Sequence, residues 1–134
     1  MASELSKLSE QFSVTAQTSF IKQQSDRESN RFVFAYTIAI QNKSDTAAQL
    51  ISRHWLIQDA NQKIEEIYGE GVVGQQPLIK PGESYSYTSG AVLETEMGTM
   101  EGRYFLISTS SGNANNEFEI IIPRFVLSVP RTIH

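Results

Sequence analysis

The segment of this chain with the clearest chemical potential is 69–74, which reads GEGVVG. It matches the G-x-G-x-x-G spacing of loops that bind the phosphates of dinucleotides. In those loops the glycines let backbone N–H groups approach the anion, and a helix that begins at the last glycine adds unpaired donors. A phosphate-bearing small molecule, such as pyrophosphate or a nucleotide, is therefore one candidate ligand. Its candidate binding residues are Gly69, Gly71, Gly74, Arg53 and Lys80.

The residues that follow this motif do not suit a phosphate-binding helix. The stretch between Gly74 and Pro81 would make about 9 Å of helix, and Pro77 shortens it further. Glu70 lies inside the motif and no Lys or Arg occurs in 64–79, so the local charge opposes an anion. The motif is more simply explained as a bend or bulge between strands, where glycine avoids side-chain clashes. A surface nest of N–H groups for a small anion stays open as an alternative.

No other group of residues predicts catalysis. The chain has no cysteine, which excludes disulfides, thiol nucleophiles and zinc–thiolate sites. Its two histidines, His54 and His134, form no metal-binding spacing such as H-x-x-x-H, and no G-x-S-x-G elbow is present. The acidic pairs Glu65/Glu66 and Glu94/Glu96 could hold a hard cation such as Mg²⁺ or Co²⁺, but their exposure on a solvated surface is the simpler explanation. We therefore expect no catalytic residue, no metal site and no cofactor.

Hydrophobic residues alternate along most of the chain, which is typical of strands that bury one face. In RFVFAYTIAI (31–40), every second residue is large and apolar. Turn-forming residues separate these segments, and KPGE (80–83) predicts a type II turn. Antiparallel strands without helices between them predict an all-β fold, a fibronectin type III or immunoglobulin-like antiparallel β-sandwich of about seven strands. The expected strands are 12–20, 31–40, 50–58, 63–68, 83–93, 103–109 and 117–129.

The length predicts one domain, 1–134, in which residues 1–11 form a flexible N-terminal extension. Trp55 is expected in the core, on the third strand. Pro123 cannot donate to a ladder, so it predicts that the last strand is an edge or kinks there. Residues 110–116, SSGNANN, are expected to form a polar loop.

Composition narrows the classes of partner. The net charge of −4 and the scattered basic residues argue against nucleic acid, whose binding depends on neutralising phosphates. No apolar run approaches about 18 residues, so no membrane span is expected, and the lack of cysteine and of a signal peptide favours the cytoplasm. An unidentified protein is the favoured partner, with the aromatic side chains of Tyr85 and Tyr87 as its candidate contact surface. Exposed edge strands also allow a homodimer.

The chain contains several specific motifs: SRHWLI (52–57), GEGVVG (69–74), PGE (81–83), SGAVLETEMGTMEGRY (89–104) and VPRTIH (129–134). On these motifs the chain resembles the bacterial ApaG family, also called CorD, over about residues 14–134. The resemblance implies a fibronectin type III-like sandwich, a link to cobalt resistance and magnesium efflux, and no defined enzymatic reaction. The same domain occurs fused in eukaryotic proteins, including an F-box protein and a DNA-polymerase-interacting protein, where it resembles a protein-binding module. The family's glycine motif, a possible pyrophosphate or nucleotide site, maps onto Gly69, Gly71 and Gly74.

The residues and the resemblance support two hypotheses for function. The first is a non-enzymatic cytoplasmic protein-interaction module that is linked to cobalt resistance and magnesium efflux. The alternative is a protein that binds a phosphate-bearing small molecule at the GEGVVG loop.

Overall fold

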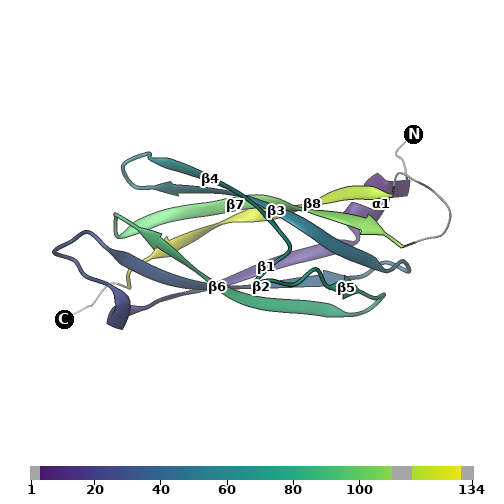
Figure 1. The fold of residues 1–134 in the computed structure, drawn as a ribbon, viewed down its shortest axis with the longest axis horizontal. Helices are drawn as coiled ribbons and strands as arrows, with labels where there is room; N and C mark the ends of the chain where they lie inside the picture. The colour runs from purple at the N-terminus through teal and green to yellow at the C-terminus, as the bar shows by residue number, and fades with distance from the viewer. Residues whose placement is uncertain (1–3, 110–115, 131–134) are drawn as a thin grey trace.

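The computed structural model describes residues 4–109 and 116–130 and shows two antiparallel β-sheets packed face to face (Figure 1). The smaller sheet has the order β1 (Phe12–Phe20), β2 (Phe32–Asn42), β6 (Ser84–Leu93). The larger sheet has the order β4 (Ile64–Glu70), β3 (Ala48–Asp59), β7 (Met97–Ser108), β8 (Glu117–Ser128), and the short β5 (Leu78–Ile79) also pairs with β3. The helix α1 (Glu4–Glu10) precedes β1, and one 3-10 turn, η1 (Lys22–Gln24), follows it.

The all-β sandwich predicted from the sequence is confirmed, and each expected segment overlaps a strand. The strand β7 begins at Met97, earlier than the predicted 103, and β5 was not predicted. Within the described ranges, every helix is too short to cross a membrane.

Alternating side chains from both sheets build one core. The side chains of Ile38 and Ile40 in β2 are fully buried, and Trp55 in β3 is only 2% exposed. The Trp55 ring lies edge-on to Tyr36 at 5.5 Å and to Phe125 at 5.9 Å between ring centroids. Burying one such side chain stabilises the fold by about 1.5–3 kcal/mol. The predicted core position of Trp55 is therefore confirmed.

Residues 4–11 differ from the flexible extension that the sequence predicts for residues 1–11, of which 1–3 lie outside the described residues. Residues Glu4–Glu10 form α1, which packs against β8, and the side chain of Leu8 is only 7% exposed. The N–H of Gln11 donates to the carbonyl of Leu8 at 3.0 Å after the last turn. A helix this short depends on tertiary packing, which a local sequence pattern does not report.

Two local predictions are confirmed. Gly82 has a φ of 81°, and the N–H of Glu83 donates to the carbonyl of Lys80 at 2.9 Å, as in a type II turn. The strand β8 pairs only with β7 among the described strands, and their register shifts where Pro123 interrupts the ladder.

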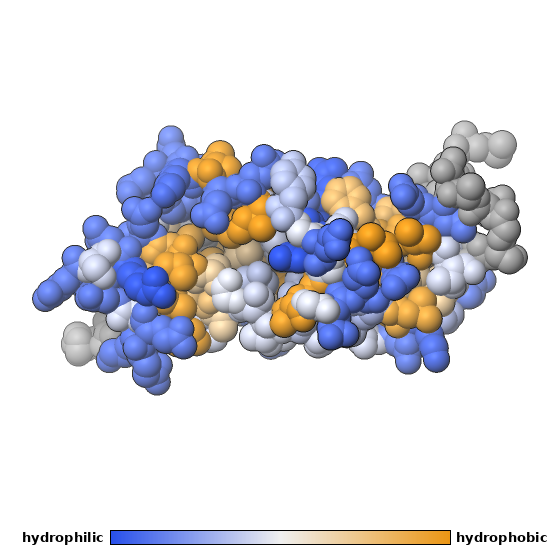
Figure 2. All heavy atoms as spheres, in the orientation of Figure 1, coloured by the Kyte–Doolittle hydropathy of each residue, from blue (hydrophilic) through white to orange (hydrophobic). Residues whose placement is uncertain are grey.

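The two long sides of the sandwich differ. On one side β1 lies against β8 (Figure 1). On the other side β6 and β4 are the edge strands of their sheets, and a pocket opens between them. In the view of Figure 2, apolar side chains form several separate clusters among polar ones. Concave features occur both beside the edge strands and on the sheet faces, and these are the candidate binding sites.

Candidate functional site

The GEGVVG loop ends in a tight β-turn between β4 and β5. The N–H of Val72 donates to the carbonyl of Gln75 at 2.8 Å, and the N–H of Gln75 returns a bond of 3.0 Å to Val72. The two central residues, Val73 and Gly74, have φ values of 48° and 75°, which is the pattern of a type I′ turn. Residues 75–77 are not helical and β5 follows directly, so the helix of a dinucleotide cradle is missing.

Of the other two glycines of the motif, Gly71 is required by close packing against the backbone, whereas Gly69 lies against the end of the flexible Arg53 side chain. A Cβ atom on Gly71 would lie 2.2 Å from the carbonyl oxygen of Gln75, and its own N–H donates to the carbonyl of Ile51 at 2.7 Å. A Cβ atom on Gly69 would lie 2.6 Å from the guanidinium carbon of Arg53. Because N–H groups of this loop are already bonded within the protein, a phosphate site at the three glycines stays a prediction.

Arg53 holds the loop against β3. Its Nη1 group donates to the carbonyl oxygens of Glu70 at 3.0 Å and Gly71 at 2.7 Å. Lys80 lies in the turn before β6, where its backbone N–H donates to Oε1 of Glu83 at 2.9 Å. The structure thus brings Arg53 to the glycines, but Lys80 is not among the residues that line the adjoining pocket.

This pocket, with a volume of about 330 Å³, lies between the two sheets behind the loop; we name it the interlayer pocket. Its walls include Tyr36 and Tyr87 from the smaller sheet, Arg53 and Trp55 from β3, and Gly74 from the loop. In the described parts of the chain, Nε1 of Trp55 is the one buried side-chain nitrogen or oxygen without a hydrogen-bond partner. A buried N–H group without a partner costs free energy, and this nitrogen has almost no surface that an incoming acceptor could reach.

Tyr85 and Tyr87 face inward, unlike the exposed contact surface expected from the sequence. Tyr87 is 8% exposed, and Tyr85 packs against the core while half-buried. The alternation along β6 turns odd-numbered residues towards the core and leaves Ser86 and Thr88 outside. Tyr87 is instead a wall of the interlayer pocket.

The hydroxyl groups of Tyr87 and Tyr104 hydrogen-bond to each other inside the core. Burial raises the pKa of both groups above the ordinary value of about 10, and the neighbouring Tyr87 raises the pKa of Tyr104 further. Above about pH 10, Tyr87 and Tyr104 lose their hydroxyl protons in the unfolded chain but keep them in the folded chain. Raising the pH therefore destabilises the fold, by up to about 1.4 kcal/mol per pH unit for each tyrosine.

We expect urea unfolding at several alkaline pH values to show this loss, and a Tyr87→Phe/Tyr104→Phe double variant to lose most of it. The double variant removes both hydroxyl partners together, so its stability at neutral pH should change little. If the free energy of unfolding falls equally with alkaline pH in the wild type and in the double variant, the prediction is contradicted.

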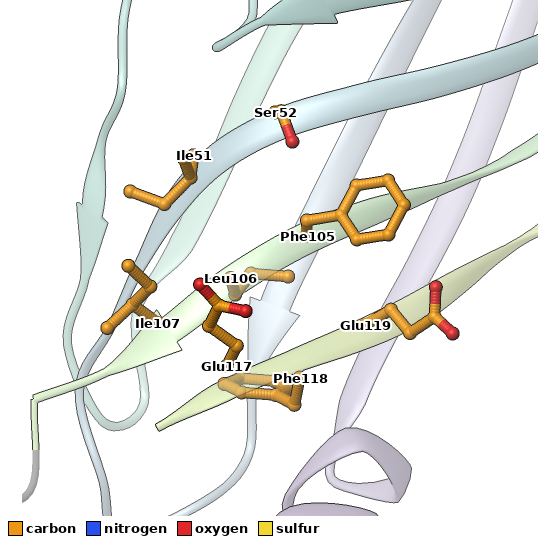
Figure 3. Close-up of a pocket in the computed structure, with 8 residues that line it drawn as sticks. All are labelled: Ile51, Ser52, Phe105, Leu106, Ile107, Glu117, Phe118 and Glu119. Carbon is orange, nitrogen blue, oxygen red and sulfur yellow. The ribbon is translucent and has the colours of Figure 1, made fainter. Parts of the chain in front are cut away.

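A second concavity of about 430 Å³ lies on the outer face of the larger sheet (Figure 3). We name it the outer hollow; it is lined by Ile51 and Ser52 of β3, Phe105, Leu106 and Ile107 of β7, and Glu117, Phe118 and Glu119 of β8. The β3–β7 register skips Ile51, which is a β-bulge between the paired Leu50 and Ser52. Sequence reasoning missed this site because strand pairing, rather than any local motif, brings its residues together.

His54 lies on the same outer face and is engaged with its neighbours. Its ring stacks on Tyr68 with centroids 4.2 Å apart, and its Nε2 lies 2.8 Å from Oε2 of Glu66. The hydrogen bonds from His54 and then Tyr68 lower the pKa of Glu66. Within the described residues, no group of three or more His, Asp or Glu side chains could hold a metal ion. His134 lies outside those residues.

Comparison with known proteins gives concordant matches. The ApaG domain model matches residues 22–108. The protein ApaG of Thiobacillus denitrificans is 48% identical over 124 residues, with 92% of this chain and 94% of the relative covered. The protein ApaG of Dechloromonas aromatica is 50% identical over 115 residues, with 86% and 87% covered. The names of these two relatives state no enzymatic reaction.

A solved structure agrees with the fold. The crystal structure of a putative ApaA protein from Bordetella pertussis superposes with a TM-score of 0.84 at 43% identity, and covers 90% of this chain and 95% of that one. The match covers most of both chains, so the two proteins share this fold. With a matching family model, near-full-length relatives and a matching solved structure, this chain belongs to the ApaG family.

Proposed function

We propose that this protein is a non-enzymatic binding module that docks a partner protein on the outer face of its larger sheet, at the outer hollow. The distribution of exposed apolar side chains carries this proposal. Of the nine large apolar side chains that are exposed in the described chain, seven project from that face, and they are Ile64, Tyr68, Leu78, Met97, Ile107, Ile121 and Val126.

The outer face of the smaller sheet is different. The outward positions of β6 include Ser84, Ser86 and Thr88, and Val92 is its one large exposed apolar side chain among the described residues. Polar residues such as Gln49 and Arg103 lie between most of these side chains, and Ile107 is the member of the set that lines the outer hollow, but the outer face of the larger sheet still carries most of the exposed apolar side chains. The asymmetry between the two faces therefore favours docking on the larger sheet.

Charge indicates the chemistry of the docked segment. On the outer face Glu119 pairs with Arg103, and Glu101 pairs with Arg124. Glu117, at the rim of the outer hollow beside Ile107, has no ion pair with any described residue. A partner segment that places apolar side chains in the hollow and a Lys or Arg against Glu117 would complement both features.

Membership of the ApaG family and the lack of a metal-binding group among the described residues favour an indirect role in the cell. In this proposal the protein acts in the cytoplasm and influences cobalt resistance and magnesium efflux through its protein partner. Direct binding of the cation is not required.

A capture experiment with one charge-introducing variant on each face tests the proposal. Ile107→Asp places an acid in the outer hollow, while Val92→Asp makes the same kind of change on the outer face of the smaller sheet. We expect a protein that crosslinks to the wild type and to Val92→Asp in cell lysate, and a loss of about tenfold or more in its affinity for Ile107→Asp. Equal capture by both variants, or no captured protein at all, would overturn the proposal.

A further inference from the structure

The strand β4 lies at the edge of the larger sheet and pairs with β3 on one side only (Figure 1). Two hydrogen bonds fix the alternation of this ladder. At its start, the N–H of Asp59 donates to the carbonyl of Lys63 at 3.0 Å. At its other end, the N–H of Gly71 donates to the carbonyl of Ile51 at 2.7 Å. The odd-numbered residues at this end of the sheet are therefore the ones that bond to β3.

The even-numbered residues of β4 carry backbone groups that point away from the sheet. Because the register between β3 and β4 contains no bulge, the N–H and C=O groups of Ile64, Glu66 and Tyr68 face outward. The carbonyl of Glu70 faces the same way and accepts a hydrogen bond from Nη1 of Arg53. No residue in the described ranges bonds to the outward groups of the other three. Such an edge can pair with an added extended segment.

Two large apolar side chains of β4 are exposed on one face. Ile64 is 61% exposed and Tyr68 is 69% exposed, and their spacing places both on the outer face of the sheet. The Tyr68 ring is held in place, because it stacks on His54 and its hydroxyl donates to Oε2 of Glu66 at 3.1 Å. A fixed, exposed aromatic side chain is typical of residues that anchor interfaces.

The charge of β4 indicates which segment would pair with it. Glu65, Glu66 and Glu70 are exposed, and the strand contains no Lys or Arg. A second copy of β4 would bring like charges together across the new ladder, which is destabilising. A segment that carries Lys or Arg would instead complement these carboxylates. The other open edge strand, β6, contains no charged residue and makes no such selection.

We propose that the outer edge of β4 binds an extended basic segment of a partner protein, which extends the larger sheet as an added antiparallel strand. Apolar side chains of this segment pack on Ile64 and Tyr68, and its Lys or Arg side chains pair with Glu65 and Glu66. This inference goes beyond docking at the outer hollow, because the hollow is lined by residues of β3, β7 and β8.

A short synthetic peptide serves as the probe, with valines placed opposite Ile64 and Tyr68, lysines opposite Glu65 and Glu66, and threonines elsewhere. We expect saturation of the full chain with this peptide to slow amide hydrogen exchange at Ile64, Glu66 and Tyr68 by about tenfold or more, because their N–H groups gain acceptors. Unchanged exchange at these three residues would overturn the proposal. Slower exchange along β6 in place of β4 would also overturn it.

Two methylated forms of the peptide separate strand pairing from attraction between charges. Methyl groups on the peptide nitrogens that face β4 remove its donors and should weaken binding by about tenfold or more. Methyl groups on the alternate nitrogens, which face away, should leave the affinity within about twofold. Equal affinities of the two forms would mean that charge alone holds the peptide, and the proposal would be wrong.

A pair of charge variants localises the binding. Glu65→Lys reverses a charge on β4, whereas Glu10→Lys makes the same change in α1, which packs against β8 at the opposite edge of the larger sheet. We expect Glu65→Lys to bind the peptide about tenfold more weakly and Glu10→Lys to bind it like the wild type. Equal binding by both variants would contradict the proposal. The peptide tests the edge of β4 alone, so its result is independent of capture at the outer hollow.

Discussion

Replacing Gly102 by alanine should lower the free energy of unfolding by about 3 kcal/mol, the upper end of the usual cost of overpacking a core. Gly102 lies in β7 and pairs with Trp55 in the central strand β3. A Cβ atom there would lie 2.0 Å from the carbonyl oxygen of His54 and 3.2 Å from the Cα atom of Trp55. These are backbone atoms held in a sheet, so they cannot move aside as the end of a flexible side chain can. The β3–β7 ladder would have to part locally.

Gly90 provides a matched control, because it is also a strand glycine without a positive φ. A Cβ atom on Gly90 would meet nothing closer than the carbonyl oxygen of Phe34 at 3.5 Å, an ordinary contact. Gly90→Ala should therefore leave stability unchanged or raise it by up to about 1 kcal/mol through the lower entropy of the unfolded chain. Urea unfolding of the two variants measures the difference. Equal stabilities would show that β3 and β7 separate at little cost.

Gly102 also illustrates what the sequence could not reveal. Hydrophobic alternation depends on neighbouring residues only, so it located strands such as β2, predicted at 31–40 and found at Phe32–Asn42. The need for glycine at position 102 depends on how closely β3 approaches, and His54 lies far from it in the chain. The missing prediction of β5 has the same origin, because two residues form a strand only where the edge of β3 is available to pair with them.

For the candidate sites too, some features follow from neighbouring residues in the sequence and others depend on contacts between distant strands. The reading of GEGVVG as a bend rested on local facts, namely the prolines and the charge around it, and the turn at Val72–Gln75 agrees with it. The role of Arg53 as a brace for the loop, and the inward position of Tyr87, depend on contacts between strands. The unpartnered N–H of Trp55 could not be inferred from the sequence at all, because it is defined by what the rest of the core does not offer.

Asn42, the last residue of β2, is a further residue whose importance only the structure shows, since in the sequence it is simply one of several turn-forming residues at 42–45. Its side chain is fully buried. Its Nδ2 donates to the carbonyls of Thr46 at 2.9 Å and Ile79 at 3.0 Å. Its Oδ1 accepts from the N–H and the hydroxyl of Ser44 at 2.9 and 2.6 Å. One amide thus joins the end of β2, the following turn and β5.

We expect Asn42→Ala to lower the free energy of unfolding by about 3 kcal/mol or more, because it leaves several buried polar groups without partners at about 1–3 kcal/mol each. The exposed neighbour Gln41, also a side-chain amide on β2, gives the control. Gln41→Ala should stay within about 0.5 kcal/mol of the wild type. Urea unfolding at neutral pH compares them, and similar stabilities would show that water replaces the amide of Asn42.

The Asn42→Asp variant separates the role of the donor from that of packing, because it keeps the shape of the side chain and replaces the NH₂ group by oxygen. At neutral pH a buried carboxylate would then face the carbonyls of Thr46 and Ile79, with no donor between them. The fold would raise the pKa of the new carboxyl above the value of about 3.9 for the unfolded chain. The variant should therefore lose stability relative to the wild type as the pH rises from about 4 until the folded form also ionises. A constant difference between the two proteins across this range would show that Nδ2 of Asn42 does not hold β5 in place.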